Sequence, residues 1–225
     1  MGSYFLKILF AVFVCLLHIK VSVLGFNSPP ESSQVKCIES EREALLNFKQ
    51  SVPDYHGMLF TWRDDENNRD CCKWEGIECN NETGHVEMLD LRGGSTSHYL
   101  SGSINITSLC DLQYLEYLDL TFNYFPNSQI PVSIGSFQRL RYLNLSCSSF
   151  SGTIPYELEN LSKLEYLDLK SNDLLGEIPS QLGNLSSLRY LDLSDNYYIN
   201  GEIPSQLGSL SHLRYIDLSY TCWDF

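Results

Sequence analysis

Positively charged side chains are scarce in this 225-residue chain. It has 15 Lys and Arg against 28 Asp and Glu, a formal net charge of −13 at pH 7. Proteins that bind duplex nucleic acid neutralise its phosphates with clustered Lys and Arg, and anionic membrane surfaces require similar clusters. The composition therefore predicts no nucleic-acid partner. With 43% hydrophobic residues, the chain still has enough apolar side chains for one domain of ordinary size or two small ones.

Motifs of known catalytic chemistry are missing as well. The sequence has no G-x-S-x-G, H-E-x-x-H or P-loop pattern. Its five histidines are scattered, without the spacing of metal ligands or of a triad, at His18, His56, His85, His98 and His212. We therefore expect no enzyme, no catalytic residue, no metal and no cofactor.

Long apolar runs are limited to the N-terminus. Residues 1–25 combine one early cation, Lys7, an apolar run from Ile8 to Leu17 and the small-residue end Val23-Leu24-Gly25, which is typical of a secretory signal peptide. The alternative, a membrane anchor, needs about 20 apolar residues to cross the hydrocarbon, and this run ends before His18. We expect no membrane span in this chain, a secreted product and oxidising conditions for its cysteines.

Residues 26–84 are predicted to form an N-terminal cap with one helix. The helix should begin at Ser40, because Ser40 and Glu43 have the spacing of a capping box. Its buried face is predicted from four apolar residues at helical spacing, Ala44, Leu45, Phe48 and Val52. Pro53 should end the helix, and Trp62 and Trp74 should cover the buried face.

Four of the eight cysteines lie in this cap, at Cys37, Cys71, Cys72 and Cys79. They permit three pairings. Adjacent cysteines rarely pair with each other, because the bridge geometry strains a trans peptide, so we favour Cys37–Cys71 with Cys72–Cys79. A zinc site is the alternative, but the spacing has no C-x2-C and no histidine nearby.

Residues 85–225 repeat one pattern about five times, with the last copy incomplete. Equivalent positions recur every 24 or 25 residues, at Leu118, Leu143, Leu167, Leu191 and Ile216. This is the period of a leucine-rich repeat, in which stacked coils share one core. Each L-x-L segment should be a strand of a parallel sheet with its leucines pointing inward. Asn123, Asn172 and Asn196 should satisfy backbone groups where the chain leaves the strand.

The pattern as a whole resembles a known family. L-x-x-L-x-L-x-x-N-x-L-x-G-x-I-P is similar to the plant extracellular leucine-rich repeat, and the segment from Cys37 through Asp70-Cys71-Cys72-x-Trp74 to Cys79 resembles the plant N-terminal cap. The double cysteine and Thr83-Gly84-His85-Val86 are most similar to receptor-like proteins of the class that includes fungal-xylanase and other pathogen-resistance receptors. The resemblance implies an α/β repeat fold. This is a right-handed leucine-rich-repeat solenoid with a parallel concave sheet and a disulfide-stapled helical N-terminal cap.

The same resemblance implies an extracellular binding module, part of a receptor ectodomain that senses a peptide or microbial protein in defence or development. A membrane co-receptor kinase is the implied partner, and the cell surface is the implied location for a product that carries a membrane span. The sequence stops within a repeat, at Cys222-Trp223-Asp224-Phe225, so we expect exposed inward faces at Ile216 and Leu218. Two alternatives stay open. One is a secreted inhibitor of a pathogen's wall-degrading hydrolase, similar to polygalacturonase inhibitors, and the other is a nonfunctional truncated remnant.

Outward positions of the predicted strands form two columns. One is aromatic, with Tyr117, Tyr142, Tyr166, Tyr190 and Tyr215, and the other is mostly acidic, with Asp119, Asn144, Asp168, Asp192 and Asp217. Tyrosines beside carboxylates suit a peptide or protein ligand with Lys or Arg. The opposing interpretation is that both columns are scaffold, because every coil repeats them. The next outward positions differ between coils, and there the predicted ligand contacts are Phe122, Lys170, Asp195 and Tyr220.

Three smaller sets of residues complete the predictions. Glu116, Arg141, Glu165 and Arg189 alternate in sign just before the tyrosines and predict lateral ion pairs. Among five N-x-S/T sequons we expect glycans at Asn81, Asn105, Asn160 and Asn184, foremost the last two, and none at Asn144, which points from the concave sheet. Cys110, Cys147 and Cys222 stay unpaired and are expected to be buried thiols, with Cys222 the one to link molecules.

Overall fold

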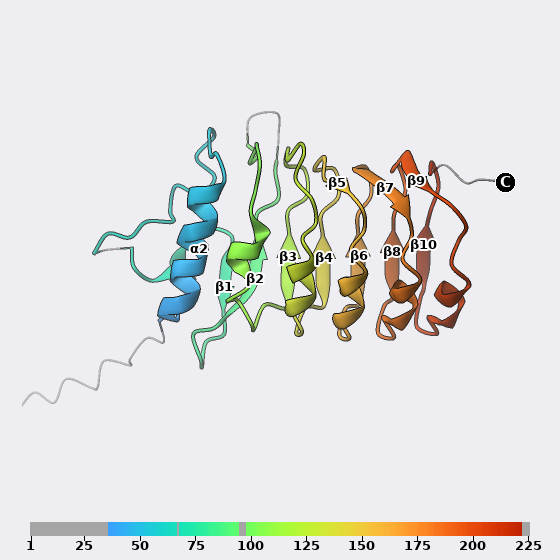
Figure 1. The fold of residues 1–225 in the computed structure, drawn as a ribbon. Helices are drawn as coiled ribbons and strands as arrows, with labels where there is room; N and C mark the ends of the chain where they lie inside the picture. The colour runs from blue at the N-terminus through green and yellow to red at the C-terminus, as the bar shows by residue number, and fades with distance from the viewer. Residues whose placement is uncertain (1–35, 67, 95–97, 222–225) are drawn as a thin grey trace, which may run out of the picture. The chain divides into compact units, whose positions relative to one another are not determined.

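The repeats form one continuous sheet. The computed structural model describes residues 36–66, 68–94 and 98–221, so the predicted signal peptide lies outside the described residues (Figure 1). The sheet has seven strands, in the order β1 (Ile77–Cys79), β2 (Val86–Asp90), β3 (Tyr117–Asp119), β4 (Tyr142–Asn144), β6 (Tyr166–Asp168), β8 (Tyr190–Asp192) and β10 (Tyr215–Asp217). β1 pairs antiparallel with β2, and every later pair is parallel, with equivalent residues side by side. The predicted parallel repeat sheet is confirmed.

The chain returns from strand to strand through short 3₁₀ helices and a second sheet. The 3₁₀ helices of the repeats span Ile106–Leu109, Val132–Ser136, Tyr156–Asn160, Ser180–Asn184 and Ser205–Ser209. A proline precedes each of the last four, because its fixed φ suits a helix start and its missing N–H is not needed there. The second sheet contains β5 (Ser151–Gly152), β7 (Asp173–Glu177) and β9 (Tyr198–Asn200).

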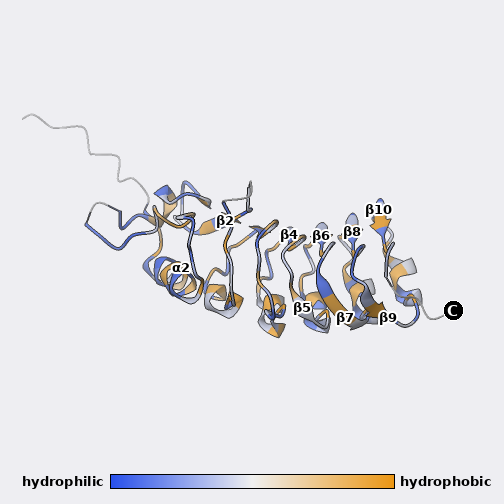
Figure 2. Ribbon diagram, turned by 90° about the horizontal axis from the view of Figure 1, so that it is seen from above, coloured by the Kyte–Doolittle hydropathy of each residue, from blue (hydrophilic) through white to orange (hydrophobic). Residues whose placement is uncertain are grey.

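Each coil buries one side and exposes the other, so apolar and polar stretches alternate along the coils (Figure 2). The inward leucines, such as Leu167 and Leu169, have no exposed surface. Asn172 donates to the carbonyls of Leu145 and Leu169, both at 2.9 Å, and accepts from the N–H of Phe150 at 2.9 Å. Asn123 and Asn196 make the equivalent bonds. The predicted structural role of these asparagines is confirmed.

The cap helix, α2 (Glu39–Ser51), does not begin with the predicted capping box. Ile38 is its N-cap residue and no side chain caps it. The acids of the first turn bond to other groups instead, Glu39 within the helix and Glu41 to the first repeat strand. Glu39 pairs with Arg42 at 2.5 Å, and the buried Glu41 accepts from Val86 N–H at 2.7 Å. The predicted end is confirmed, since Val52 is extended just before Pro53.

The apolar face of α2 is covered as the sequence predicts. The four predicted apolar residues are buried. The ring centroids of Phe48 and Trp62 are 6.3 Å apart, and Trp62 stacks on Trp74 with the ring centroids 5.6 Å apart. Disulfides join Cys37 to Cys71 and Cys72 to Cys79, which is the favoured pairing. A zinc ion would need these sulfurs as thiolates, so the bridges replace the zinc alternative.

The last described coil exposes residues that are buried elsewhere. Ile216 is 45% exposed, whereas its equivalent Leu191 has no exposed surface, and Leu218 is half-buried. Across the described ranges no helix is long and apolar enough to cross a membrane.

Candidate binding surface

Five tyrosines stack along the outward side of the large sheet. The parallel register places Tyr117, Tyr142, Tyr166, Tyr190 and Tyr215 side by side. Neighbouring ring centroids are 4.2 to 4.4 Å apart and the ring planes differ by at most 11°. This surface is termed the tyrosine face. Because the rings cover one another's faces, they offer mainly edges and hydroxyl groups to a ligand.

The acidic column lies beneath the tyrosines rather than beside them. Asp119 and Asp192 are 1% and 2% exposed. One carboxylate oxygen accepts from a tyrosine hydroxyl, as Asp168 does from Tyr166 at 3.2 Å. The other accepts from the N–H two residues later, as Asp192 does from Ser194 at 2.9 Å. Ligand contact by Asp119, Asp168 and Asp192 stays a prediction, and in this structure their oxygens are buried and already paired. The alternation of side chains along a strand predicted which side of the sheet these carboxylates lie on, but not how deeply they are buried.

Burial and these carboxylates also control the ionisation of the face. The pKa of Tyr117 and that of Tyr166 are raised, first by burial and then by the adjacent Asp. Burial likewise raises the pKa of the Asp168 carboxyl. Asp217 differs, because hydrogen bonds from Ser219 lower its pKa. The tyrosine face is consequently a row of neutral phenols above buried carboxylates, and the half-buried Asp217 is the more accessible end of that acidic row.

Residues that leave the strands form a second, more varied column. Phe122, Cys147, Ser171, Asp195 and Tyr220 all have φ between 52° and 57°. This left-handed conformation is uncommon for residues other than glycine, and no sequence pattern predicted it. Phe122 and Tyr220 are 60% and 71% exposed. Together with Lys170 these residues form the strand-end edge, where Lys170 Nζ lies 3.6 Å from Asp195 Oδ2. The structure thus brings predicted contacts Lys170 and Asp195 together, while Phe122 and Tyr220 lie on separate coils.

Ion pairs border the opposite edge of the tyrosine face. Arg141 lies 3.4 Å from Glu116 and 2.8 Å from Glu165, and Arg189 lies 3.2 Å from Glu165. The predicted alternating ladder is confirmed. The two edges therefore differ in chemistry, because one is a row of ion pairs and the other combines the exposed aromatic rings of Phe122 and Tyr220 with one Lys–Asp pair.

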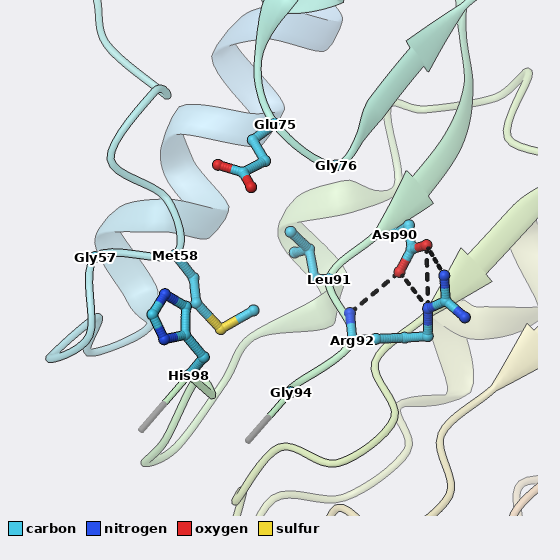
Figure 3. Close-up of a pocket in the computed structure, with 9 residues that line it drawn as sticks. All are labelled: Gly57, Met58, Glu75, Gly76, Asp90, Leu91, Arg92, Gly94 and His98. Carbon is cyan, nitrogen blue, oxygen red and sulfur yellow. Dashed lines mark hydrogen bonds and ion pairs between the residues drawn. The ribbon is translucent and has the colours of Figure 1, made fainter. Parts of the chain in front are cut away.

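A cavity of about 390 Å³ lies where the cap meets the end of β2 (Figure 3). Met58 and His98 line it on one side and Glu75 on the other. Arg92 at its rim is held by Asp90, with a closest contact of 2.7 Å. Sequence reasoning missed this cavity, because its walls come from segments that only the fold brings together.

The predicted modification sites and free thiols are distributed around the coils. Asn81, Asn105, Asn160 and Asn184 are exposed, whereas Asn144 is 8% exposed and accepts from Ser146 Oγ at 2.7 Å. Cys110 and Cys147 are free but only half-buried, so their expected full burial is wrong. Burial still raises the pKa of the Cys147 thiol. Cys222 lies outside the described residues.

Two family models match the chain. A leucine-rich repeat region covers residues 82–224, and a leucine-rich repeat N-terminal domain covers residues 38–80. The chain belongs to the leucine-rich repeat family. The inward leucines, the asparagine turns and the bridged cap are this family's repeat and N-terminal domain as they occur here.

Receptor-like proteins of plants are similar to it in sequence. Receptor-like proteins EIX1 and EIX2 of Solanum lycopersicum are 48% and 49% identical over 128 and 132 residues. These alignments cover 53% and 56% of this chain and 12% of each relative. The resemblance to receptor-like proteins is confirmed, and the chain spans a small part of the relatives' length.

Solved leucine-rich repeat structures share the fold. A plant ice-binding protein is 33% identical with a TM-score of 0.72, over 84% of this chain and 58% of that one. The PEPR1–AtPEP1 structure is 28% identical with a TM-score of 0.73, over 83% and 25%. The plant peptide hormone receptor RGFR1 in complex with RGF2 is 32% identical with a TM-score of 0.60, over 68% and 26%.

Proposed function

We propose that this chain is a non-enzymatic extracellular recognition module, part of a plant receptor-like protein ectodomain, and that it binds a peptide or protein. The strand-end edge carries the proposal. Phe122 and Tyr220 are exposed, Lys170 and Asp195 are half-exposed, and these positions vary from coil to coil on a constant scaffold. Exposed variation on a rigid frame is what a binding surface requires.

The charge of the chain and its relatives support the same function. A net charge of −13 and the accessible carboxylates of Asp195 and Asp217 favour a ligand with Lys or Arg. Similarity to receptor-like proteins and to a peptide hormone receptor supports a peptide or protein ligand. In this proposal residues 1–25 are the signal peptide, 26–84 the cap and 85–225 the repeats. The product is secreted, or held at the cell surface where a membrane span is present, and a membrane co-receptor kinase is its partner.

A peptide-display experiment tests the proposal. The secreted chain is immobilised and panned with two linear peptide libraries that are identical except that one contains Lys and Arg. We expect enrichment from the cationic library, and a loss of affinity of about tenfold or more in Asp195→Lys and in Phe122→Ala.

The matched control is Asp173→Lys, because Asp173 is an exposed acid of β7 in the other sheet. It should leave affinity unchanged. Equal enrichment from both libraries, or binding that Asp195→Lys does not alter, would refute the proposed surface.

A further inference from the structure

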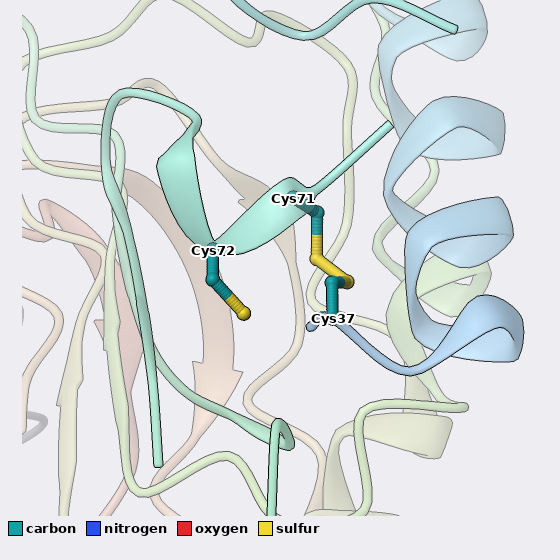
Figure 4. Close-up of side chains that lie close together, drawn as sticks. All are labelled: Cys37, Cys71 and Cys72. Carbon is teal, nitrogen blue, oxygen red and sulfur yellow. A yellow bond between two sulfur atoms is a disulfide. The ribbon is translucent and has the colours of Figure 1, made fainter. Parts of the chain in front are cut away.

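Three cysteine sulfurs of the cap are clustered. The Sγ atoms of Cys37, Cys71 and Cys72 lie within 4.8 Å of one another. Cys72 points toward the Cys37–Cys71 bridge (Figure 4), although its own partner is Cys79. A third sulfur this close to a disulfide is placed to exchange with it after a small side-chain rotation, once it becomes a thiolate.

Backbone contacts hold Cys37 beside both neighbours. Its N–H donates to Asp70 Oδ1 at 3.1 Å, next to Cys71. The following N–H, of Ile38, donates to the carbonyl of Gly84 at 3.4 Å, and the Cys72 sulfur lies 3.9 Å from that same carbonyl. Opening one bridge therefore leaves the three residues close together.

The four bridged cysteines differ in access from solvent. Cys71 has no exposed surface, whereas Cys37, Cys72 and Cys79 are all half-buried. An external thiol consequently reaches the Cys72–Cys79 bridge more readily than the Cys71 side of the other bridge.

We propose that the cap is a thiol–disulfide exchange site that takes an external dithiol as reductant. The dithiol reduces Cys72–Cys79 to two thiols and is itself oxidised to a disulfide. The Cys72 thiolate then attacks Cys37 Sγ. The Cys37–Cys72 bond forms, the Cys37–Cys71 bond breaks, and Cys71 leaves as a thiolate that takes up the proton lost by Cys72. Attack on Cys71 is disfavoured, because it would bridge adjacent residues.

The exchange changes what the bridges hold. The start of α2 stays covalently tied to the Cys71–Cys72 turn in both forms. β1, which ends at Cys79, loses its covalent tie to that turn and is then held by strand pairing with β2 and by the packing of Ile77 in the core. The proposal concerns the cap alone and does not depend on the proposed ligand.

The Cys79→Ser variant tests the exchange without any reductant, because it leaves Cys72 unpaired. Free thiols of the secreted variant are blocked with iodoacetamide, the bridges are then reduced and labelled with N-ethylmaleimide, and fragment ions assign each label to Cys71 or Cys72. We expect iodoacetamide on both residues, each in about a tenth of molecules or more. Iodoacetamide on Cys72 alone would overturn the proposal.

A second variant and a partial reduction of the wild-type chain complete the test. In Cys72→Ser the attacking sulfur is gone, so Cys71 should never carry iodoacetamide. Wild-type chain treated with substoichiometric dithiothreitol should yield molecules with free Cys71 and Cys79, which requires no variant to fold. If the partly reduced wild type shows only Cys72 and Cys79 free, the exchange does not occur.

Discussion

Asn172 shows how much one side chain contributes to this structure. Its amide bonds to backbone groups of two coils, from the Leu145 carbonyl to the Phe150 N–H. We expect Asn172→Ala to lower the free energy of unfolding by about 3 kcal/mol, because each buried group left unpaired costs about 1–3 kcal/mol. Urea denaturation followed by circular dichroism measures the change.

A surface asparagine provides the matched control. Asn200 in β9 is exposed, so Asn200→Ala should change the free energy of unfolding by less than about 0.5 kcal/mol. Similar losses in the two variants would mean that the amide of Asn172 contributes no more than an ordinary surface residue.

Residue type predicted the role of Asn172 but not the burial of Asp168. An amide that both donates and accepts has an evident use at a turn, and its repeat position located it. Burial of Asp168 depends on the stacked tyrosines above it, which is a property of neighbouring coils rather than of its own strand. The left-handed φ of Phe122 was hidden for a similar reason, since the stack imposes it on a residue that does not prefer it.

The ionisation of the tyrosine face is linked to folding. In the folded chain the pKa of Tyr166 lies above its ordinary value of 10.0, with burial as the main cause. Above pH 10 the unfolded chain therefore loses protons that the folded chain retains. The contribution of this shift to the free energy of unfolding is complete below pH 10 and is lost as the pH rises through the raised tyrosine pKa values. Denaturant titrations at neutral and alkaline pH should show this decline.

Two phenylalanine variants distinguish the contribution of the tyrosine face from that of a tyrosine elsewhere. Tyr166→Phe removes one group with a raised pKa and should reduce the alkaline loss. Tyr55→Phe removes a phenol that is 80% exposed and should leave it unchanged. An identical decline of the free energy of unfolding at alkaline pH in both variants would show that the tyrosine face does not cause it.

A buried acid joins the cap helix to the first repeat strand by hydrogen bonds. Glu41 accepts from His85 Nδ1 and from the Val86 N–H, both at 2.7 Å. Glu41→Ala leaves a buried N–H without its acceptor, so we expect a loss of about 2 kcal/mol in the free energy of unfolding. Glu43→Ala, an exposed acid of the same helix, should cost less than about 0.5 kcal/mol. Equal urea midpoints for both variants would mean that the hydrogen bonds of Glu41 do not stabilise the fold.

These contacts explain why the helix was predicted well in extent and wrongly at its start. Apolar spacing and Pro53 are local signals, and they located the buried face and the end. The capping box is local too, but here the helix begins before it, and the buried Glu41 bonds to Val86, a tertiary contact that no local pattern reveals.

At the scale of the whole molecule, stacking assigns each repeated position to one surface. Positions in register form columns, so the tyrosine face, its ion-paired edge and its strand-end edge each extend along the sheet. This follows from the sequence period, which is why the fold could be predicted almost completely. The exposure of each column could not, because it depends on how side chains of neighbouring coils pack over one another. The cavity beside Met58 is a further example, since it needs the cap and β2 in place.

Glycan positions test this assignment of surfaces. Asn160 and Asn184 are exposed and end their 3₁₀ helices, whereas Asn144 lies in β4 beneath the tyrosine face. Its amide oxygen already accepts from Ser146, the hydroxyl residue of its own sequon. In a product secreted from plant cells we expect glycans at Asn160 and Asn184 and none at Asn144, as read by glycopeptide mass spectrometry. Ser162→Ala should therefore remove one glycan and Ser146→Ala none. A glycan at Asn144 would mean that the tyrosine face is not available to a ligand, because the attached sugar would cover it.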